Sequence, residues 1–140
     1  MPDACIFCLI TEGRLHCEKL YESEHLMAFL DIAPAFPGHA LIVPKVHSRD
    51  IFSMQQPVGE ELLEAMRLVG AAVMAAAGAE GLNIIQNNGR AAWQQVDHVH
   101  WHLIPRRDGD GFEPWKQGTY ESGKAMADMA ERIRARLCRG

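Results

Sequence analysis

The chain of 140 residues has no long apolar run, few aromatic residues and no excess of positive charge. Lysine and arginine number 14 and aspartate and glutamate 18, which gives a net charge of −4. This balance argues against a protein whose main function is to bind the phosphate backbone of a nucleic acid. The longest apolar stretch, residues 68–79, is too short to span a bilayer. The first residues lack the basic start and apolar core of a signal peptide. We therefore expect a cytoplasmic protein that binds neither nucleic acid nor membrane.

The cysteines do not form a disulfide framework. Three of the four lie within the first seventeen residues, and the fourth is Cys138. Hydrophobic residues make up 48% of the chain and charged residues 23%, which excludes a disordered or fibrous protein. The length suits a single domain over residues 1–140, with a motif-bearing core in 1–108 and a C-terminal loop and helix in 109–140. The unusual feature is seven histidines in so short a chain.

Hydrophobic periodicity predicts an α+β fold. Apolar residues recur at three- and four-residue spacing over 57–77 and again over 122–137, which favours two helices. Short apolar runs bounded by turn residues predict strands at 20–22, 26–30, 40–43, 83–86 and 98–104. Strands joined by short loops indicate a largely antiparallel sheet of about five strands, with one central and one C-terminal helix.

The segment from Asp97 to Pro105 contains three histidines in strict alternation with apolar residues. Side chains alternate between the two faces of a strand, so His98, His100 and His102 are expected on one face, about 6.6–6.8 Å apart in succession. Two chemistries suit such a patch. One is metal ligation by imidazole, and the other is nucleophilic and acid–base catalysis. The pattern alone leaves both open, including a division of the two among the three residues.

The sequence resembles the histidine triad (HIT) superfamily of nucleotide hydrolases and transferases, and is most similar to the small bacterial histidine triad nucleotide-binding proteins. Five motifs carry the resemblance: His98-Val99-His100-Trp101-His102-Leu103-Ile104, Cys5-Ile6-Phe7-Cys8, Ala28-Phe29-Leu30-Asp31-Ile32, the run from Pro37 to His47, and Asn87-Asn88-Gly89. It implies the HIT-like fold, a homodimer, and hydrolysis of purine nucleoside phosphoramidates or related nucleotidyl conjugates. Residues 109–119 would then either cross to the second subunit or form a surface loop held by two aromatic residues.

The resemblance also implies roles for single residues. His100 would be the nucleophile that forms a nucleotidyl-histidine intermediate, and His102 would stabilise charge or assist proton transfer at the phosphate. The remaining implied contacts are to the nucleotide: Asn87 and Gln94 at the phosphate, Asp31 at the ribose hydroxyls, and Phe7, Phe29 and Ile32 around the base. Without the resemblance, the polar residues would be taken as turn or solvated residues and the phenylalanines as core.

Cys5 and Cys8 form half of a possible metal site. A Cys-x-x-Cys pair alone is ambiguous between zinc binding and redox chemistry, and buried unreactive thiols are a third interpretation. The resemblance supplies His47 and His98 as the other two ligands of a structural zinc, although His39 competes with His47 on sequence grounds. Cys17 and Cys138 are expected to be ordinary thiols, and His16 and His25 loop residues.

Two residues depart from the family pattern. Trp93 stands where many relatives have glycine, and Gln95 where they often have serine or threonine. Because a glycine there lets the backbone approach phosphate, a tryptophan either reroutes the loop or covers the side of the leaving group. Three rival functions remain: a dinucleoside polyphosphate hydrolase, a zinc-stabilised nucleotide-binding module with little catalysis, and a Cys-x-x-Cys redox protein.

Overall fold

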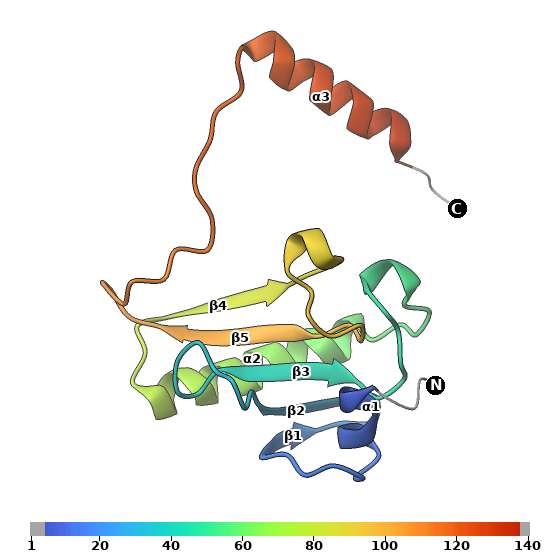
Figure 1. Ribbon diagram of the computed structural model, residues 1–140, viewed down its shortest axis with the longest axis vertical. Helices are drawn as coiled ribbons and strands as arrows, with labels where there is room; N and C mark the ends of the chain where they lie inside the picture. The colour runs from blue at the N-terminus through green and yellow to red at the C-terminus, as the bar shows by residue number, and fades with distance from the viewer. Residues whose placement is uncertain (1–4, 138–140) are drawn as a thin grey trace. The chain divides into compact units, whose positions relative to one another are not determined.

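The computed structural model describes residues 5–137, which contain a five-stranded sheet (Figure 1). The strands are β1 (Lys19–Glu22), β2 (Leu26–Leu30), β3 (Ala40–Pro44), β4 (Gly81–Gln86) and β5 (Trp101–Arg106). The α-helices are α1 (Ile6–Thr11), α2 (Gly59–Ala77) and α3 (Gly123–Arg136), and two short 3₁₀ helices are η1 (Ile51–Ser53) and η2 (Arg90–Ala92). The α+β class and the antiparallel sheet predicted from the sequence are confirmed.

The chain divides into two compact units, with the boundary between Asp110 and Gly111. The first unit contains the sheet, and the second contains α3. This boundary lies close to the expected end of the motif-bearing core, while the single-domain organisation over 1–140 stays a prediction. Cys138 lies outside the described residues. Within residues 5–137, no helix is long and apolar enough to cross a bilayer.

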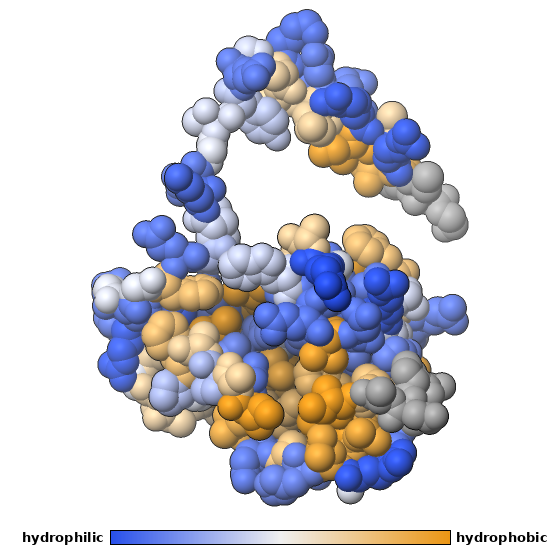
Figure 2. Space-filling view, in the orientation of Figure 1, coloured by the Kyte–Doolittle hydropathy of each residue, from blue (hydrophilic) through white to orange (hydrophobic). Residues whose placement is uncertain are grey.

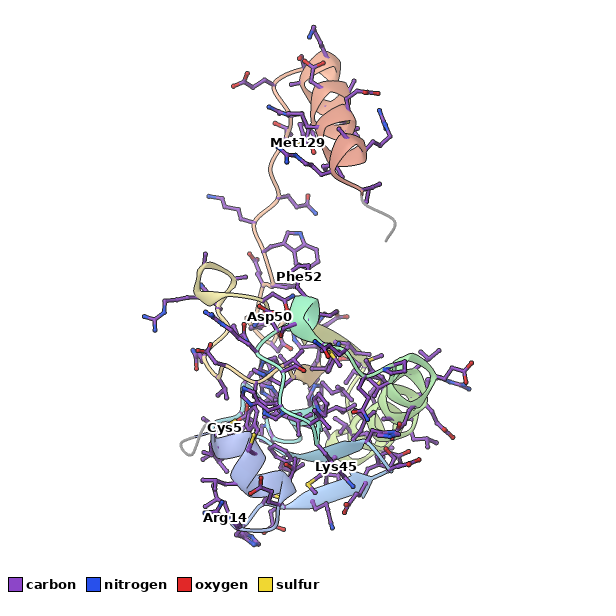
Figure 3. The ribbon with its side chains drawn as sticks, turned by 90° about the vertical axis from the view of Figure 1, so that its right-hand side faces the viewer. Cys5, Arg14, Lys45, Asp50, Phe52 and Met129 are labelled. Atoms are coloured by element: carbon purple, nitrogen blue, oxygen red, sulfur yellow. The ribbon has the colours of Figure 1, made fainter. Side chains whose placement is uncertain are left out.

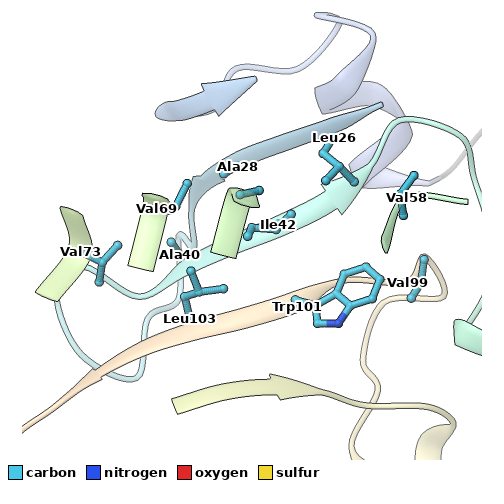
Figure 4. Close-up of a cluster of buried hydrophobic side chains, with 11 residues drawn as sticks. Leu26, Ala28, Ala40, Ile42, Val58, Val69, Val73, Val99, Trp101 and Leu103 are labelled. Carbon is cyan, nitrogen blue, oxygen red and sulfur yellow. The ribbon is translucent and has the colours of Figure 1, made fainter. Parts of the chain in front are cut away.

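The strands follow the order β1-β2-β3-β5-β4, and every neighbouring pair is antiparallel. One face of the sheet packs on α2 through a core of small and branched side chains (Figure 4). This core consists of Leu26, Ala28, Ala40, Ile42, Val58, Ala65, Val69, Val73, Val99, Trp101 and Leu103. A second cluster contains Cys5, Phe7, Cys8, Ile10, Met27, Phe29, Leu41 and Val43. Because alternate residues of β2 and β3 belong to different clusters, each strand is buried on both faces.

The central helix is the best-predicted element. The sequence predicts 57–77, and α2 begins at Gly59 and ends at Ala77. Glu60 and Glu61 lie in its first turn, where carboxylates interact favourably with the helix dipole. Gly78 ends the helix in a left-handed conformation, with φ of 61°, which glycine adopts without steric cost.

The histidine segment differs from its prediction in extent. β5 begins at Trp101 rather than His98, because the Val99 amide donates to the Ser48 carbonyl at 2.7 Å instead of entering the ladder. Pro105, expected to end the strand, lies within it. The pairing of β3 with β5 runs only as far as Leu103, so one side of the strand at Pro105 is an edge, where a missing N–H is tolerated. The predicted alternation still holds: Val99, Trp101 and Leu103 join the core under α2.

Candidate active site

His100 is buried and held in one tautomer. Its Nδ1 lies 2.7 Å from the carbonyl oxygen of His98, and a carbonyl only accepts hydrogen bonds. Nδ1 therefore carries the proton, and Nε2 of the neutral ring keeps a free lone pair. Burial lowers the pKa of His100, which favours this neutral form. The ring packs edge-on against Phe7 and His102, with centroid distances of 5.1 and 4.9 Å.

His102 is oriented by His39, a residue that the sequence offered only as a rival zinc ligand. The Ala35 amide donates to Nδ1 of His39 at 2.9 Å, so the proton of the neutral His39 ring lies on Nε2. That Nε2 lies 2.9 Å from Nδ1 of His102 and donates to it. The proton of His102 is thereby placed on Nε2. Burial, and after it the neighbouring His100 and His39, lower the pKa of His102 to about 4.

Asp31 follows directly after β2 and faces His39. Its Oδ1 accepts a hydrogen bond from the Ala33 amide at 2.9 Å, and its Oδ2 lies 3.6 Å from Nε2 of His39. Asp31, His39 and His102 are close enough to hold a cation. However, the Ala35 amide occupies Nδ1 of His39 and leaves the proton on Nε2, the atom that a cation would need. The donors of this group therefore suit a hydrogen-bonded chain better than a metal.

The two amide residues assigned to the phosphate have different surroundings. Gln86 pairs with Trp101 at the end of the β4–β5 ladder, and Asn87 and His100 are the next residues along the two chains. The Asn87 side chain makes no hydrogen bond to any other residue in 5–137. Gln94 is buried, and both polar atoms of its side chain are hydrogen-bonded within the protein. Its Oε1 accepts from the Gly89 amide, and its Nε2 donates to the carbonyls of Arg49 and Val96. The role of either residue at a phosphate stays a prediction.

The three apolar residues assigned to the base do not gather in one place. Phe7 and Phe29 are buried in the second core cluster, with ring centroids 5.6 Å apart. Ile32 is 93% exposed, just beyond the end of β2. Of the three, Phe7 contacts His100. The base slot stays a prediction.

Trp93 has a left-handed backbone, a conformation that glycine adopts without steric cost. Its φ is 70°, and it is the only non-glycine residue with positive φ in the described part of the chain. Such a conformation costs an L-residue roughly 1–2 kcal/mol. The loop is nevertheless held in place at the next residue, by the hydrogen bonds of Gln94. The Trp93 side chain is 81% exposed.

A possible metal site lies at the start of α1. Its four residues are Cys5, Cys8, His47 and His98, and Figure 3 labels Cys5. Nδ1 of His98 lies 3.4 Å from Sγ of Cys5 and 3.6 Å from Sγ of Cys8. Nδ1 of His47 lies 3.4 Å from Sγ of Cys8 and 3.2 Å from Nδ1 of His98. A tetrahedral zinc with ordinary bond lengths requires S···N edges of about 3.5 Å and N···N edges of about 3.3 Å. The four residues fit zinc closely.

The surroundings of this cluster also suit a metal. Nε2 of His98 donates to the Pro44 carbonyl at 2.8 Å, which leaves Nδ1 free to face the thiols. Cys5 and Cys8 form no disulfide, and the ring nitrogens of His98 and His47 lie beside their thiols. This arrangement suits a metal better than a redox dithiol. His39 does not join the cluster, because it pairs with His102.

Comparison with known proteins gives one consistent result. A family model described as HIT domain matches residues 12–109. Adenosine 5'-monophosphoramidase hnt1 of Schizosaccharomyces pombe is 44% identical over 103 residues, which cover 74% of each chain. Adenylylsulfatase HINT3 of Arabidopsis thaliana is 32% identical, over 99% of this chain and 72% of its own.

Solved structures agree. A HIT family protein from Bacillus anthracis has a TM-score of 0.87 and 36% identity, covering 99% of this chain and 100% of its own. A zinc-bound histidine triad family protein from Mycobacterium smegmatis has a TM-score of 0.65 and 34% identity, covering 94% and 97%. The chain therefore belongs to the HIT domain family and is an enzyme of the HIT hydrolase type.

Proposed function

We propose that the protein hydrolyses purine nucleoside phosphoramidates or related nucleotidyl conjugates through a covalent intermediate on His100. The observation that carries this proposal is the hydrogen bond from Nδ1 of His100 to the His98 carbonyl, which presents Nε2 as a neutral nucleophile. Relatives named as an adenosine 5'-monophosphoramidase and an adenylylsulfatase support the substrate class.

The reaction has two steps. Nε2 of His100 attacks the α-phosphorus, a phosphorus–Nε2 bond forms and the bond from phosphorus to the amine nitrogen breaks. The departing amine takes its proton from solvent, and the N–H at Nε2 of His102, the atom on which His39 places the proton, donates a hydrogen bond to the phosphoryl group. Water then attacks the phosphorus, the phosphorus–Nε2 bond breaks, and one proton returns to solvent as the nucleoside monophosphate leaves and the His100 ring becomes neutral again. A positioned hydrogen-bond donor at developing charge is typically worth about 10²–10³-fold in rate.

The nucleotide is proposed to lie along the histidine segment. Asp31, partly exposed beside His39, would accept hydrogen bonds from the ribose hydroxyls. Asn87, whose side-chain amide makes no hydrogen bond within residues 5–137, would donate to a phosphate oxygen. Phe7, Phe29 and Ile32 would border the base, and Gln94 would hold the phosphate loop in shape.

The test is direct detection of the intermediate. Adenosine 5'-phosphoramidate is mixed with the protein, the reaction is quenched rapidly, and intact mass is measured together with AMP release. We expect a transient mass increase of one adenylyl group in the wild type and neither adduct nor turnover in His100→Ala. The exposed His16, substituted in the same way, is the matched control. Full activity of His100→Ala would disprove the assignment.

The same assay separates the alternatives. Faster turnover of a diadenosine polyphosphate than of the phosphoramidate would indicate a dinucleoside polyphosphate hydrolase. Tight AMP binding without turnover of any conjugate would indicate a nucleotide-binding module.

We also propose that Cys5, Cys8, His47 and His98 hold a structural zinc. The separations of their ligand atoms and the hydrogen bond from His98 to Pro44 support it, as does the zinc-bound relative. All four tetrahedral positions would be filled by protein, which is typical of a structural site. Zinc would fix His98, whose carbonyl oxygen orients His100.

A cytoplasmic homodimer is proposed as the working state. Beyond Arg67, the exposed residues of α2 are all apolar: Leu68, Ala71, Ala72, Ala75 and Ala76. The second unit also exposes an apolar surface. Its helix α3 buries no residue and exposes apolar side chains along one side (Figure 2). Surfaces of this kind commonly mark contacts between proteins, and a second copy of the chain is the partner that we propose.

A further inference from the structure

We infer that Trp93 selects the leaving group by stacking on a planar aromatic ring. The preferred conjugates would then carry an aryl amine or a second base beyond the phosphate. This inference rests on the proposed function, and it concerns a residue in which the chain departs from the family pattern.

The loop that carries Trp93 begins and ends beside the nucleophile. It starts after Gln86, the ladder partner of Trp101, and it returns to His98, whose carbonyl holds His100. Both ends of the loop over residues 87–97 are therefore anchored beside His100. We place Trp93, near the middle of this loop, on the side from which the leaving group departs.

The loop is rigidly held next to Trp93. Gln94 forms three hydrogen bonds, to the Gly89 amide and to the Arg49 and Val96 carbonyls. A further bond joins the Ile51 amide to Asn88, so the turns at η1 and η2 are tied together, and Figure 1 shows them on neighbouring loops. The position of the Trp93 backbone is thus fixed by its neighbours.

The Trp93 side chain gains little from the fold. Its backbone is left-handed, which bulky residues avoid, and its ring is 81% exposed. The ring forms no aromatic or cation–π contact with another residue in the described range. A strained residue with a large apolar surface and no internal partner is the pattern expected of a contact reserved for a ligand.

Sheet order determines which end of the substrate meets Trp93. Asp31, the proposed ribose contact, follows β2, while the Trp93 loop follows β4, on the other side of β3 and β5. With the phosphate over His100 in between, the nucleoside extends toward β2. The leaving group then extends toward β4 and Trp93. Aromatic rings stack on one another more favourably than saturated rings of similar size stack on them, so an aryl group is favoured there.

The test uses two adenosine 5'-phosphoramidates that differ only in the ring, one made with phenethylamine and one with cyclohexylethylamine. The variants are Trp93→Leu and Trp93→Gly, with Phe52→Leu as the control. Phe52 is an exposed aromatic residue at η1 (Figure 3), and its ring is 85% exposed. Trp93→Gly is included because glycine suits φ of 70° and leaves the loop unstrained.

We expect the wild type to prefer the phenethyl substrate and both Trp93 variants to lose about tenfold in kcat/KM for it. The cyclohexyl substrate should change less than about twofold, and Phe52→Leu should change neither. Equal losses on both substrates, or no preference in the wild type, would overturn the inference. If the wild type releases AMP from neither substrate, the proposed function is wrong. Calorimetric binding of both compounds to His100→Ala then decides the role of Trp93, because stacking predicts tighter binding of the phenethyl compound, lost in Trp93→Leu.

Discussion

Nε2 of His39 lies 2.9 Å from Nδ1 of His102, and the Ala35 amide holds the other nitrogen of the His39 ring. A backbone N–H thus determines the proton positions of two side-chain rings in succession. The residue at the end of this chain, His102, presents an N–H toward the proposed phosphate site.

Substitution of His39 should therefore impair catalysis more than binding. In His39→Ala, His102 loses the donor that fixes its tautomer, and we expect kcat to fall about 10–100-fold with little change in AMP affinity. The measurements are steady-state kinetics and AMP binding by calorimetry. His39→Gln, which can keep a donor near the same place, should recover part of kcat. An unchanged kcat in His39→Ala would contradict a role for His39 in orienting His102.

Removal of the metal should destabilise the first unit. Cys8→Ser removes one of four proposed ligands, so the purified variant should contain no zinc, whereas Cys17→Ser should keep one per chain. Zinc at a thousandfold excess over its Kd stabilises the native state by about 4 kcal/mol, and this amount should be lost. Metal analysis and urea unfolding provide the test. Equal zinc content in the two variants would disprove the ligand set.

Acid should destabilise the protein through His102. The pKa of His102 in the folded protein is about 4, below the ordinary histidine value of 6.5, so between these values the unfolded chain binds more protons than the folded one. The free energy of unfolding should fall as pH decreases from 6.5 to 4, and the full contribution should be present above 6.5. Urea unfolding of the zinc-loaded protein at pH 7 and pH 5 measures this effect. In His102→Asn, the difference between the two pH values should be smaller; an unchanged difference would count against this assignment.

A charge on the apolar surface of α2 should separate the subunits. Leu68 is 53% exposed within a run without charged residues, and Leu68→Glu would place a carboxylate in the proposed interface. Light scattering should find a dimer for the wild type and for the exposed-surface control Arg14→Glu, and a monomer for Leu68→Glu. A wild-type monomer at micromolar concentration would rule out the proposed dimer.

The sequence predicted the elements that have a strong period. The strand 26–30 has the observed limits, the helix 57–77 starts two residues early, and the alternation of the histidine segment is observed. The six-residue α1 escaped prediction because it is too short to show a helical period, and its N-cap is Cys5. The late start of β5, at Trp101 rather than at His98, was also not predicted. It depends on a hydrogen bond to the carbonyl of Ser48, which is distant in the sequence.

The site was predictable in its residue types and less so in its pairings. Nothing local distinguishes His39 from His47, because the choice depends on contacts with His102 and Cys8 across the sheet. The internal hydrogen bonds of Gln94 likewise arise from the folded loop. The left-handed backbone at Trp93 had one signal, because the resemblance to the HIT superfamily implies a glycine at that position.

His98 takes part in both the thiol cluster and the surroundings of His100. Its ring faces the thiols, while its carbonyl oxygen fixes the proton of His100. Tilting this one peptide would therefore misalign the proposed nucleophile even if every substrate contact were intact. Because the proposed zinc would need both thiols, losing either cysteine would loosen this peptide as well as the metal site. A chain without the two cysteines would have to anchor the same peptide by packing alone.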